Sequence, residues 1–248
     1  MTLSIDIREE SGVRYLHFGS DWVQGAMRLA APDALELHYT REMMAGLLLR
    51  DAPWPRRVLM IGLGAASMVR YFHHHFPRTV VDVVEIDERV VMAARHFFEL
   101  PEESPQLQIH IADGADFVCS KGPAYDLILT DGFDHLARSG RLAGAPYYTA
   151  ARARLSDEGV MSVNLFSRGF AASFARFDRT FDGRTLAFAS RDQGNMIALA
   201  AAGEPVAVPV GEVRERAVAL NERTGLDLRP AVARIESVTR ARSGVVRL

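Results

Sequence analysis

The sequence predicts an α/β protein built on a doubly wound, mostly parallel sheet and preceded by a small antiparallel sheet. From residue 57 onward, short continuous apolar runs alternate with stretches of helical periodicity. Continuous apolar runs are typical of parallel strands buried on both faces, and strand–helix alternation is typical of right-handed βαβ units. Two later strand-like runs have so short a connection that they must form an antiparallel hairpin.

The first 32 residues predict the small sheet. Ser-Gly and Gly-Ser-Asp segments separate three β-like runs, as expected for the turns of a meander. The runs are 3–8, 13–18 and 22–29. Pro32 then precedes a predicted helix from about residue 34 to residue 50, with Leu35, Tyr39 and Met43 on one face.

Five apolar runs predict the parallel strands of the main sheet. These runs are 58–61, 80–84, 107–111, 127–129 and 160–163. Residues 88–100 predict a helix between the second and third strands, and phenylalanines at 170, 174, 177 and 181 predict a core-facing helix after the fifth.

The runs 185–189 and 195–201, joined only by residues 190–194, predict the hairpin. A parallel sheet that ends in a hairpin is typical of S-adenosylmethionine-dependent transferases, whereas dinucleotide dehydrogenases end in a sixth parallel strand. One tail helix is expected over 212–224, with Gly225 as its stop. We therefore expect a meander over 1–32, a nucleotide-binding α/β domain over 33–203 and a helical tail over 204–248 packed on it.

Composition excludes several classes of protein. A formal net charge of −2 provides no field that would attract nucleic acid or an anionic membrane. A single cysteine, Cys119, excludes an internal disulfide and a Cys-rich zinc site, which fits a reducing compartment. Since the N-terminal residues have no apolar signal core, we expect a cytoplasmic protein without a membrane segment.

A glycine turn follows the first main strand. Gly62 permits a tight turn and Gly64 permits close approach of a nucleotide, although the third glycine of the dinucleotide pattern is Ser67. Glu85 ends the second strand, 21 residues after Gly64, at the spacing of an acidic residue that binds ribose hydroxyls. An ordinary strand–helix turn and a solvated strand end are the alternatives.

Two further acidic positions follow strands. Asp113, before Gly114, lies where a carboxylate accepts the adenine amine in this fold class, but it also suits the N-cap of a helix, and one residue can do both. Asp131 and Asp134 follow the fourth strand, at the edge where open α/β sheets bind ligands. Two carboxylates there suit a cationic amine that must lose a proton before it attacks; the alternative is an Asp/Gly turn.

Two other motifs have simpler interpretations. Tyr147 and Tyr148 begin a predicted helix facing the same edge, as core aromatics or as a wall for an aliphatic amine. The run from His73 to His75 does not predict a metal site, because consecutive helical residues point about 100° apart and three adjacent imidazoles cannot converge on one ion. We expect no metal.

The motifs together resemble the spermidine synthase family of aminopropyltransferases. The resemblance extends over about residues 13–200 and is closest to the spermidine synthase-like bacterial branch. It is strongest in V-L-M-I-G-L-G (58–64), V-V-E-I-D (83–87), A-D-G (112–114) and Y-D-L-I-L-T-D-G-F-D (125–134). The resemblance implies transfer of the aminopropyl group of decarboxylated S-adenosylmethionine to an amine or polyamine, with release of methylthioadenosine. It also implies a homodimer.

The resemblance assigns roles residue by residue. Asp131 would be the general base, and Asp134, Tyr147, Tyr148 and Arg41 would line the substrate side. The implied nucleoside-binding residues are Gln24, Gly62, Gly64, Ala65, Glu85, Ile86, Asp113 and Gly114.

Two departures from the family pattern concern the donor. The aspartate of the family's glycine loop falls at Ala65, and its Tyr-His pair falls at Thr40-Arg41, or at His38-Tyr39 in a shifted register. Because a negative charge is lost and Arg41 can bind a carboxylate, we expect intact S-adenosylmethionine to bind at least as well as the decarboxylated form. A methyltransferase and a non-catalytic nucleoside-binding protein remain alternatives. A nicotinamide dehydrogenase is disfavoured by the hairpin and Ser67.

Overall fold

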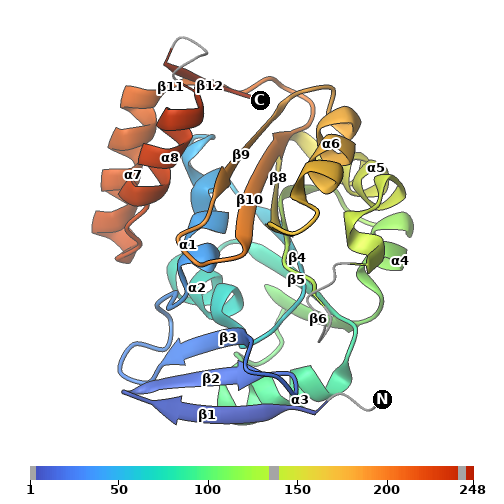
Figure 1. Cartoon of the computed structure of the whole chain (residues 1–248), viewed down its shortest axis with the longest axis vertical. Coiled ribbons are helices and arrows are strands. Elements are labelled where there is room, and N and C mark those ends of the chain that lie inside the picture. The colour runs from blue at the N-terminus through green and yellow to red at the C-terminus, as the bar shows by residue number, and fades with distance from the viewer. Residues whose placement is uncertain (1–3, 134–139, 240–243) are drawn as a thin grey trace.

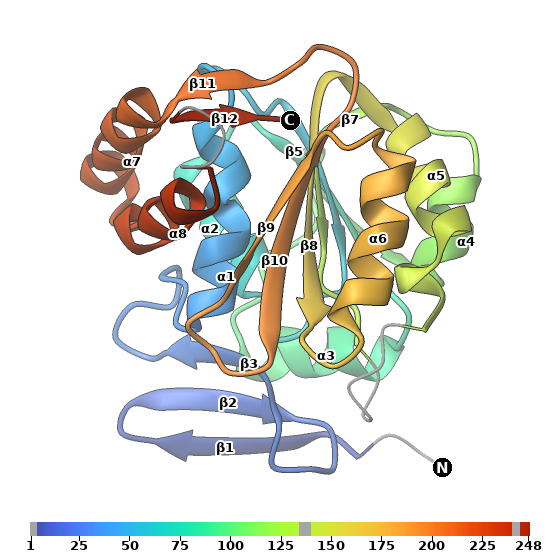
Figure 2. The same cartoon turned by 45° about the horizontal axis from the view of Figure 1, so that its top comes forward.

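A seven-stranded sheet forms the centre of the computed structural model, which describes residues 4–133, 140–239 and 244–248 (Figures 1 and 2). The strand order is β6-β5-β4-β7-β8-β10-β9; the first five strands are parallel, and β10 is antiparallel to β8 and β9. The strands are β4 (Arg57–Ile61), β5 (Val80–Glu85), β6 (Leu107–Ile111), β7 (Tyr125–Thr130), β8 (Leu155–Phe166), β9 (Thr185–Ala189) and β10 (Asn195–Ala201). The predicted doubly wound sheet with a terminal hairpin is confirmed.

Both faces of the sheet are covered, because alternate residues of each strand enter different cores. Val58 and Met60 belong to one buried cluster, and Leu59 and Ile61 belong to the other. Helices α4 (Gly114–Cys119), α5 (Ala145–Ala153) and α6 (Phe170–Thr180) cover one face, and α1 (His38–Met43), α2 (Ser67–His75) and the tail helices cover the other (Figure 2). Helix α3 (Glu88–Phe97) joins the core that contains α2.

The predicted meander forms a separate antiparallel sheet of β1 (Asp6–Glu10), β2 (Val13–His17) and β3 (Val23–Arg28), seen at the bottom of Figure 1. It lies directly on the glycine turn after β4. A Cβ at Gly25 would be 2.6 Å from the Cβ of Ala65, and Ala65 packs with Leu16 and Met27 in a small buried cluster. The meander therefore covers one side of the turn.

The helix predicted over 34–50 is shorter and changes type. Helix α1 begins only at His38 and continues as the 3₁₀ helix η1 (Met44–Leu48). Before it, the carbonyl of Pro32 accepts a hydrogen bond of 2.6 Å from Arg70 Nε, which holds this segment against α2. Within η1, a Cβ at Gly46 would lie 3.3 Å from Leu127 Cδ1, so the chain runs very close to the sheet here.

The tail contains more structure than its sequence indicated. Helix α7 (Val210–Thr224) ends as predicted at Gly225, whose φ of 72° is the left-handed C-cap conformation. A second helix, α8 (Arg229–Thr239), and a two-stranded sheet of β11 (Ala207–Pro209) and β12 (Val245–Arg247) were not predicted. Helix α8 packs against β9 (Figure 1). Among the helices in the described part of the chain, none is long and apolar enough to cross a membrane.

Arg154 connects α4 to the segment before β7. It is only 8% exposed, and its guanidinium donates to the carbonyls of Ser120 (2.9 Å), Phe117 (3.3 Å) and Pro123 (3.0 Å). The guanidinium also lies 5.2 Å from the ring centroid of Tyr125. Two of the carbonyls are at the C-terminal end of α4, where helix carbonyls lack i+4 amide partners, although that of Phe117 also accepts from the amide of Ser120.

We predict that Arg154→Met lowers the free energy of unfolding by about 2–4 kcal/mol, because three backbone carbonyls lose a charged donor and a cation–π contact is lost. Urea denaturation measures the change. The control is Arg95→Met, which breaks an ion pair with Glu103 whose side chains are 53% and 41% exposed, and should change stability by less than about 1 kcal/mol. Equal effects of the two substitutions would contradict a structural role for Arg154.

Candidate active site

A cavity of about 870 Å³ lies at the C-terminal edge of the parallel strands. Residues that follow β4, β5, β6 and β7 line it, together with the meander and the loop between β9 and β10. This is the edge where open α/β sheets bind ligands. The cavity brings together Gln24, Gly62, Gly64, Glu85, Ile86, Asp113, Gly114 and Asp131 from the predicted site.

The glycine turn and Glu85 form one wall. Gly62 has φ of 95°, and a Cβ there would lie 2.1 Å from the carbonyl oxygen of Asp131, so only glycine fits. The Glu85 carboxylate, 8% exposed, accepts from the amides of Leu63 (2.9 Å) and Asp87 (3.0 Å) through different oxygens. Burial raises the pKa of Glu85, and these amide bonds oppose that rise. Each oxygen retains acceptor capacity, so the carboxylate can bind two neighbouring hydroxyls.

Asp113 serves as the predicted N-cap of α4 and also lines the cavity. Its Oδ1 accepts from the amide of Ala115 at 2.7 Å, and its Oδ2 accepts from the Arg141 guanidinium at 3.0 Å. Ile86, 68% exposed, offers an apolar surface nearby. Gly114 is required for packing, since a Cβ there would be 2.4 Å from Ile61 Cγ2. This end of the cavity suits a flat, partly polar ring system.

Asp131 lies between two side chains from distant parts of the chain. Asn164 Nδ2 donates to Asp131 Oδ1 at 2.9 Å, and the Tyr39 hydroxyl interacts with the same carboxylate. Burial raises the pKa of Asp131, while Asn164 and Tyr39 lower it. Burial also raises the pKa of Tyr39 well above its usual value, so its hydroxyl remains a neutral donor. The carboxylate is thus oriented, and its basicity is increased relative to an exposed aspartate.

A second layer of contacts holds Tyr39. Its backbone N–H donates to Asp192 Oδ2 at 2.8 Å, in the loop between β9 and β10. The same loop donates from the amide of Arg191 to both oxygens of Glu42, each at 3.3 Å. Glu42 is 3% exposed and accepts from Arg234 Nη1, on α8, at 2.7 Å. The tail helix, the hairpin loop and α1 are therefore connected beside the cavity.

Three of these polar residues were predicted incompletely or not at all. Tyr39 was placed on the apolar face of its helix, and only the shifted register of the family's Tyr-His pair gave it a place near the donor. Asn164 could have been found, because it is a polar residue at the end of an otherwise apolar strand. Asp192 lies in the hairpin connection, and no sequence pattern distinguishes it there. All three line the cavity.

Two residues expected to lie at the donor end of the site, Arg41 and Ala65, do not line the cavity. The Arg41 guanidinium donates to the backbone carbonyls of Leu35 and Glu36 and is not among the cavity-lining residues, so it is not a free fork for a carboxylate. Ala65 is 2% exposed and points against Gly25, beneath the meander. A longer side chain at position 65 would collide with β3, so this position does not face the cavity.

The tyrosine pair also lies away from the cavity wall. Tyr147 is 2% exposed, and its hydroxyl is 2.6 Å from Thr130 Oγ1. Tyr148 is fully buried and contacts Phe177 edge-on, with ring centroids 5.1 Å apart. Both belong to the core on the α4–α6 face, which corrects their assignment as a wall for the amine. Asp134 lies outside the described residues.

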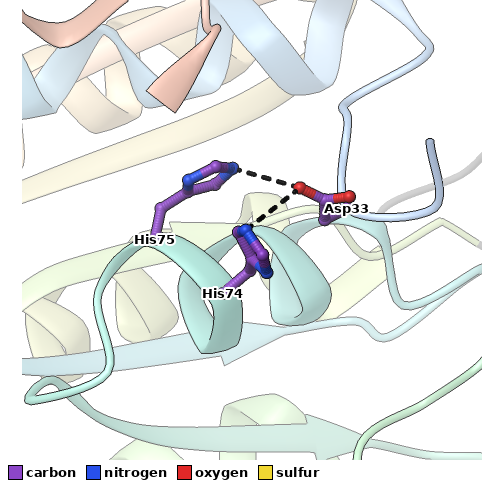
Figure 3. A group of neighbouring side chains, drawn as sticks. All are labelled: Asp33, His74 and His75. Atoms are coloured by element: carbon purple, nitrogen blue, oxygen red, sulfur yellow. Dashed lines mark ion pairs between the residues drawn. The ribbon is translucent and has the colours of Figure 1, made fainter. Parts of the chain in front are cut away.

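The histidine run behaves partly as predicted. His73 does not join its neighbours, but His74 and His75 both approach Asp33, with Nε2–Oδ2 distances of 3.7 and 3.4 Å (Figure 3). Asp33, from a different segment, provides a third potential ligand atom that the adjacent histidines alone do not. None of these residues lines the cavity.

The cavity is strongly anionic. Its acidic lining residues come from the meander, three strand ends and the hairpin loop. They are Asp21, Glu85, Asp113, Asp131 and Asp192. Arg141 is the only basic residue in the described lining, and it is paired with Asp113 and Asp116. A ligand with net positive charge is therefore favoured.

Three known proteins resemble this chain in sequence or in fold. A polyamine aminopropyltransferase of Chromobacterium violaceum is 34% identical over 242 residues, which cover 97% of this chain and 92% of that protein. A probable spermidine synthase from Corynebacterium glutamicum shares the fold, with a TM-score of 0.73 at 21% identity, over 93% of this chain and 91% of that one. Human methyltransferase-like protein 13, solved with SAH, has a TM-score of 0.68 at 25% identity, over 76% of this chain and 92% of that one.

The spermine/spermidine synthase domain matches residues 37–165, which include the glycine turn, Glu85, Asp113, Asp131 and Asn164. The match covers just over half of the chain, and the bacterial relative extends the similarity over nearly all of it. The chain belongs to the spermine/spermidine synthase family.

Proposed function

We propose that this protein transfers the aminopropyl group of decarboxylated S-adenosylmethionine to a small amine or polyamine. One observation carries the proposal: an enclosed carboxylate, Asp131, is oriented by two side chains in an anionic cavity that also contains a nucleoside-type wall. The polyamine aminopropyltransferase of Chromobacterium violaceum is similar over 97% of this chain, which supports the same reaction.

In the proposed reaction, the acceptor nitrogen attacks the methylene carbon bonded to the sulfonium. The new C–N bond forms as the C–S bond breaks, and the electron pair returns to sulfur, which leaves as neutral methylthioadenosine. An alkylammonium cannot attack until it has lost a proton, and the Asp131 carboxylate accepts that proton. Glu85 would bind the ribose and Asp113 the adenine, which positions the donor carbon beside the base.

The charge of the cavity supports the decarboxylated donor, contrary to our expectation from Ala65 and Arg41. Intact S-adenosylmethionine carries an additional carboxylate, for which the described lining offers no unpaired cation. A second carboxylate about 4 Å from Asp131 is repelled by about 1 kcal/mol in water and about 4 kcal/mol at an effective dielectric of 20. The bare ammonium of the decarboxylated donor is attracted instead.

The second candidate is methyl transfer from intact S-adenosylmethionine. The fold similarity to human methyltransferase-like protein 13 favours it. In both reactions a nucleophile attacks a carbon bonded to the same sulfonium sulfur, so the fold alone does not separate them.

The homodimer, the cytoplasmic location and the division into domains at residues 32 and 203 stay predictions.

The products decide between the two reactions. With decarboxylated S-adenosylmethionine and a panel of diamines, we predict methylthioadenosine as the product, detected by liquid chromatography. With intact donor, S-adenosylhomocysteine should not accumulate. Calorimetry should give the decarboxylated donor at least about tenfold tighter binding, the equivalent of about 1.4 kcal/mol. S-adenosylhomocysteine as the main product would establish the methyltransferase instead.

Replacement of the base should separate chemistry from binding. We predict that Asp131→Asn reduces turnover at least about 100-fold, because a positioned base contributes about 10²–10⁴-fold. Methylthioadenosine binding, measured by calorimetry, should change little. In the wild type, turnover should be lost as pH falls through a pKa above the ordinary 3.8 of aspartate, since the protonated carboxyl cannot accept a proton. Near-normal turnover by Asp131→Asn would exclude this role.

A further inference from the structure

Helix α8 is joined to the cavity by a short series of polar contacts. Arg234 donates to the buried carboxylate of Glu42 at 2.7 Å, and Glu42 also accepts hydrogen bonds from the backbone amide of Arg191. The next residue, Asp192, accepts the backbone amide of Tyr39. Three segments that are far apart in sequence therefore meet where Tyr39 approaches Asp131.

The charge on Glu42 makes this arrangement sensitive to Arg234. Glu42 is 3% exposed, and a buried carboxylate that loses its cation becomes an uncompensated charge. Arg234 also donates to Pro230 O at 3.3 Å within its own helix, which restricts its side chain. The pair thus holds α1 and the hairpin loop against the tail.

We propose that Arg234, acting through Glu42, is a positioning residue for the base. It holds α1 and the loop between β9 and β10 in the register that places Tyr39 beside Asp131. Residue 234 lies outside the matched family segment of 37–165, so the tail contributes to the active site from beyond that segment. This inference rests on the proposed role of Asp131.

The test measures Asp131 directly. A ¹³C-carboxyl NMR titration, assigned by comparison with Asp131→Asn, follows its pKa without requiring turnover. Because the interaction with Tyr39 lowers the pKa of Asp131, Tyr39→Phe should raise that pKa, and Arg234→Gln should shift it in the same direction. The turnover of Arg234→Gln should fall by about 10- to 100-fold, as for a small misplacement of reacting groups, with methylthioadenosine affinity unchanged. Arg234→Lys, which keeps the charge, should restore part of both.

The matched control is Arg214→Gln, which breaks the Arg214–Glu236 ion pair between α7 and α8 without contact to Glu42. In Arg214→Gln, the pKa of Asp131 should equal the wild-type value. If Arg234→Gln does not fold, the double variant Glu42→Gln/Arg234→Gln removes both charges and replaces it in the titration. A folded variant of either kind with a wild-type Asp131 pKa overturns the proposal. Failure of the proposed reaction would instead appear as absent turnover in the wild type.

An independent observation concerns Asp33, His74 and His75. Their ligand atoms lie within 4.8 Å of one another, and both imidazoles are directed at one carboxylate (Figure 3). Ligands about 2.0–2.1 Å from a tetrahedral ion are about 3.3–3.5 Å apart, close to the 3.4 and 3.7 Å between Asp33 Oδ2 and the two Nε2 atoms.

We infer that these three residues bind a borderline divalent cation such as Zn²⁺, which prefers imidazole with carboxylate. The ion would link the segment before α1 to the C-terminal end of α2. It has no part in the proposed reaction, since none of the three residues lines the cavity.

Calorimetry with Zn²⁺ tests the site. The wild type should bind one more equivalent of Zn²⁺ than His75→Ala, and Mg²⁺, which prefers oxygen ligands, should give no corresponding binding. His73→Ala, in the same helix but outside the group, is the matched control and should retain that equivalent. Equal zinc stoichiometry in the wild type and His75→Ala would overturn the inference.

Discussion

The enclosure of the Asp131 carboxylate is the constraint on which the active site depends. Its backbone carbonyl lies so close to Gly62 that no Cβ fits between the ends of β4 and β7. Its side chain meets Asn164 from β8 and Tyr39 from α1. Enclosure raises the basicity of the carboxylate, whereas Asn164 and Tyr39 limit that rise and fix the orientation of the carboxylate. A catalytic base must be able to accept a proton, and this environment both orients the carboxylate and raises its basicity.

The distribution of charged residues makes the described lining of the cavity acidic. The chain has only one lysine, and several of its arginines are bound to backbone carbonyls. Arg41 binds those of the segment before α1, Arg70 binds that of Pro32, and Arg154 binds those at the end of α4. Arginines used in this way stabilise loops and helix ends, but they provide no cation to the cavity. The described lining consequently keeps an excess of carboxylates, which selects cationic ligands.

Much of the fold could be predicted because its signals are local. The hairpin strands 185–189 and 195–201 and the third strand, 107–111, have the predicted bounds, since Gly-, Pro- or Ser-containing segments mark the ends of each run. Glu85, Asp113 and Asp131 line one cavity because parallel strands end at the same edge. The 34–50 helix was overextended because contact of Gly46 with the sheet, which favours the tighter 3₁₀ helix, is not visible in a periodic pattern.

The sequence by itself determined the sheet, the glycine turn and the edge at which ligands bind, because these follow from short-range periodicity and spacing. Only the tertiary structure decided which side chains meet Asp131. Tyr39 and Asn164 reach Asp131 from two segments, and Asp192 binds the backbone of Tyr39 from a third; the strand order brings all three together. It also turned Arg41 toward carbonyls and Ala65 beneath β3, because side-chain direction depends on neighbours that are distant in sequence.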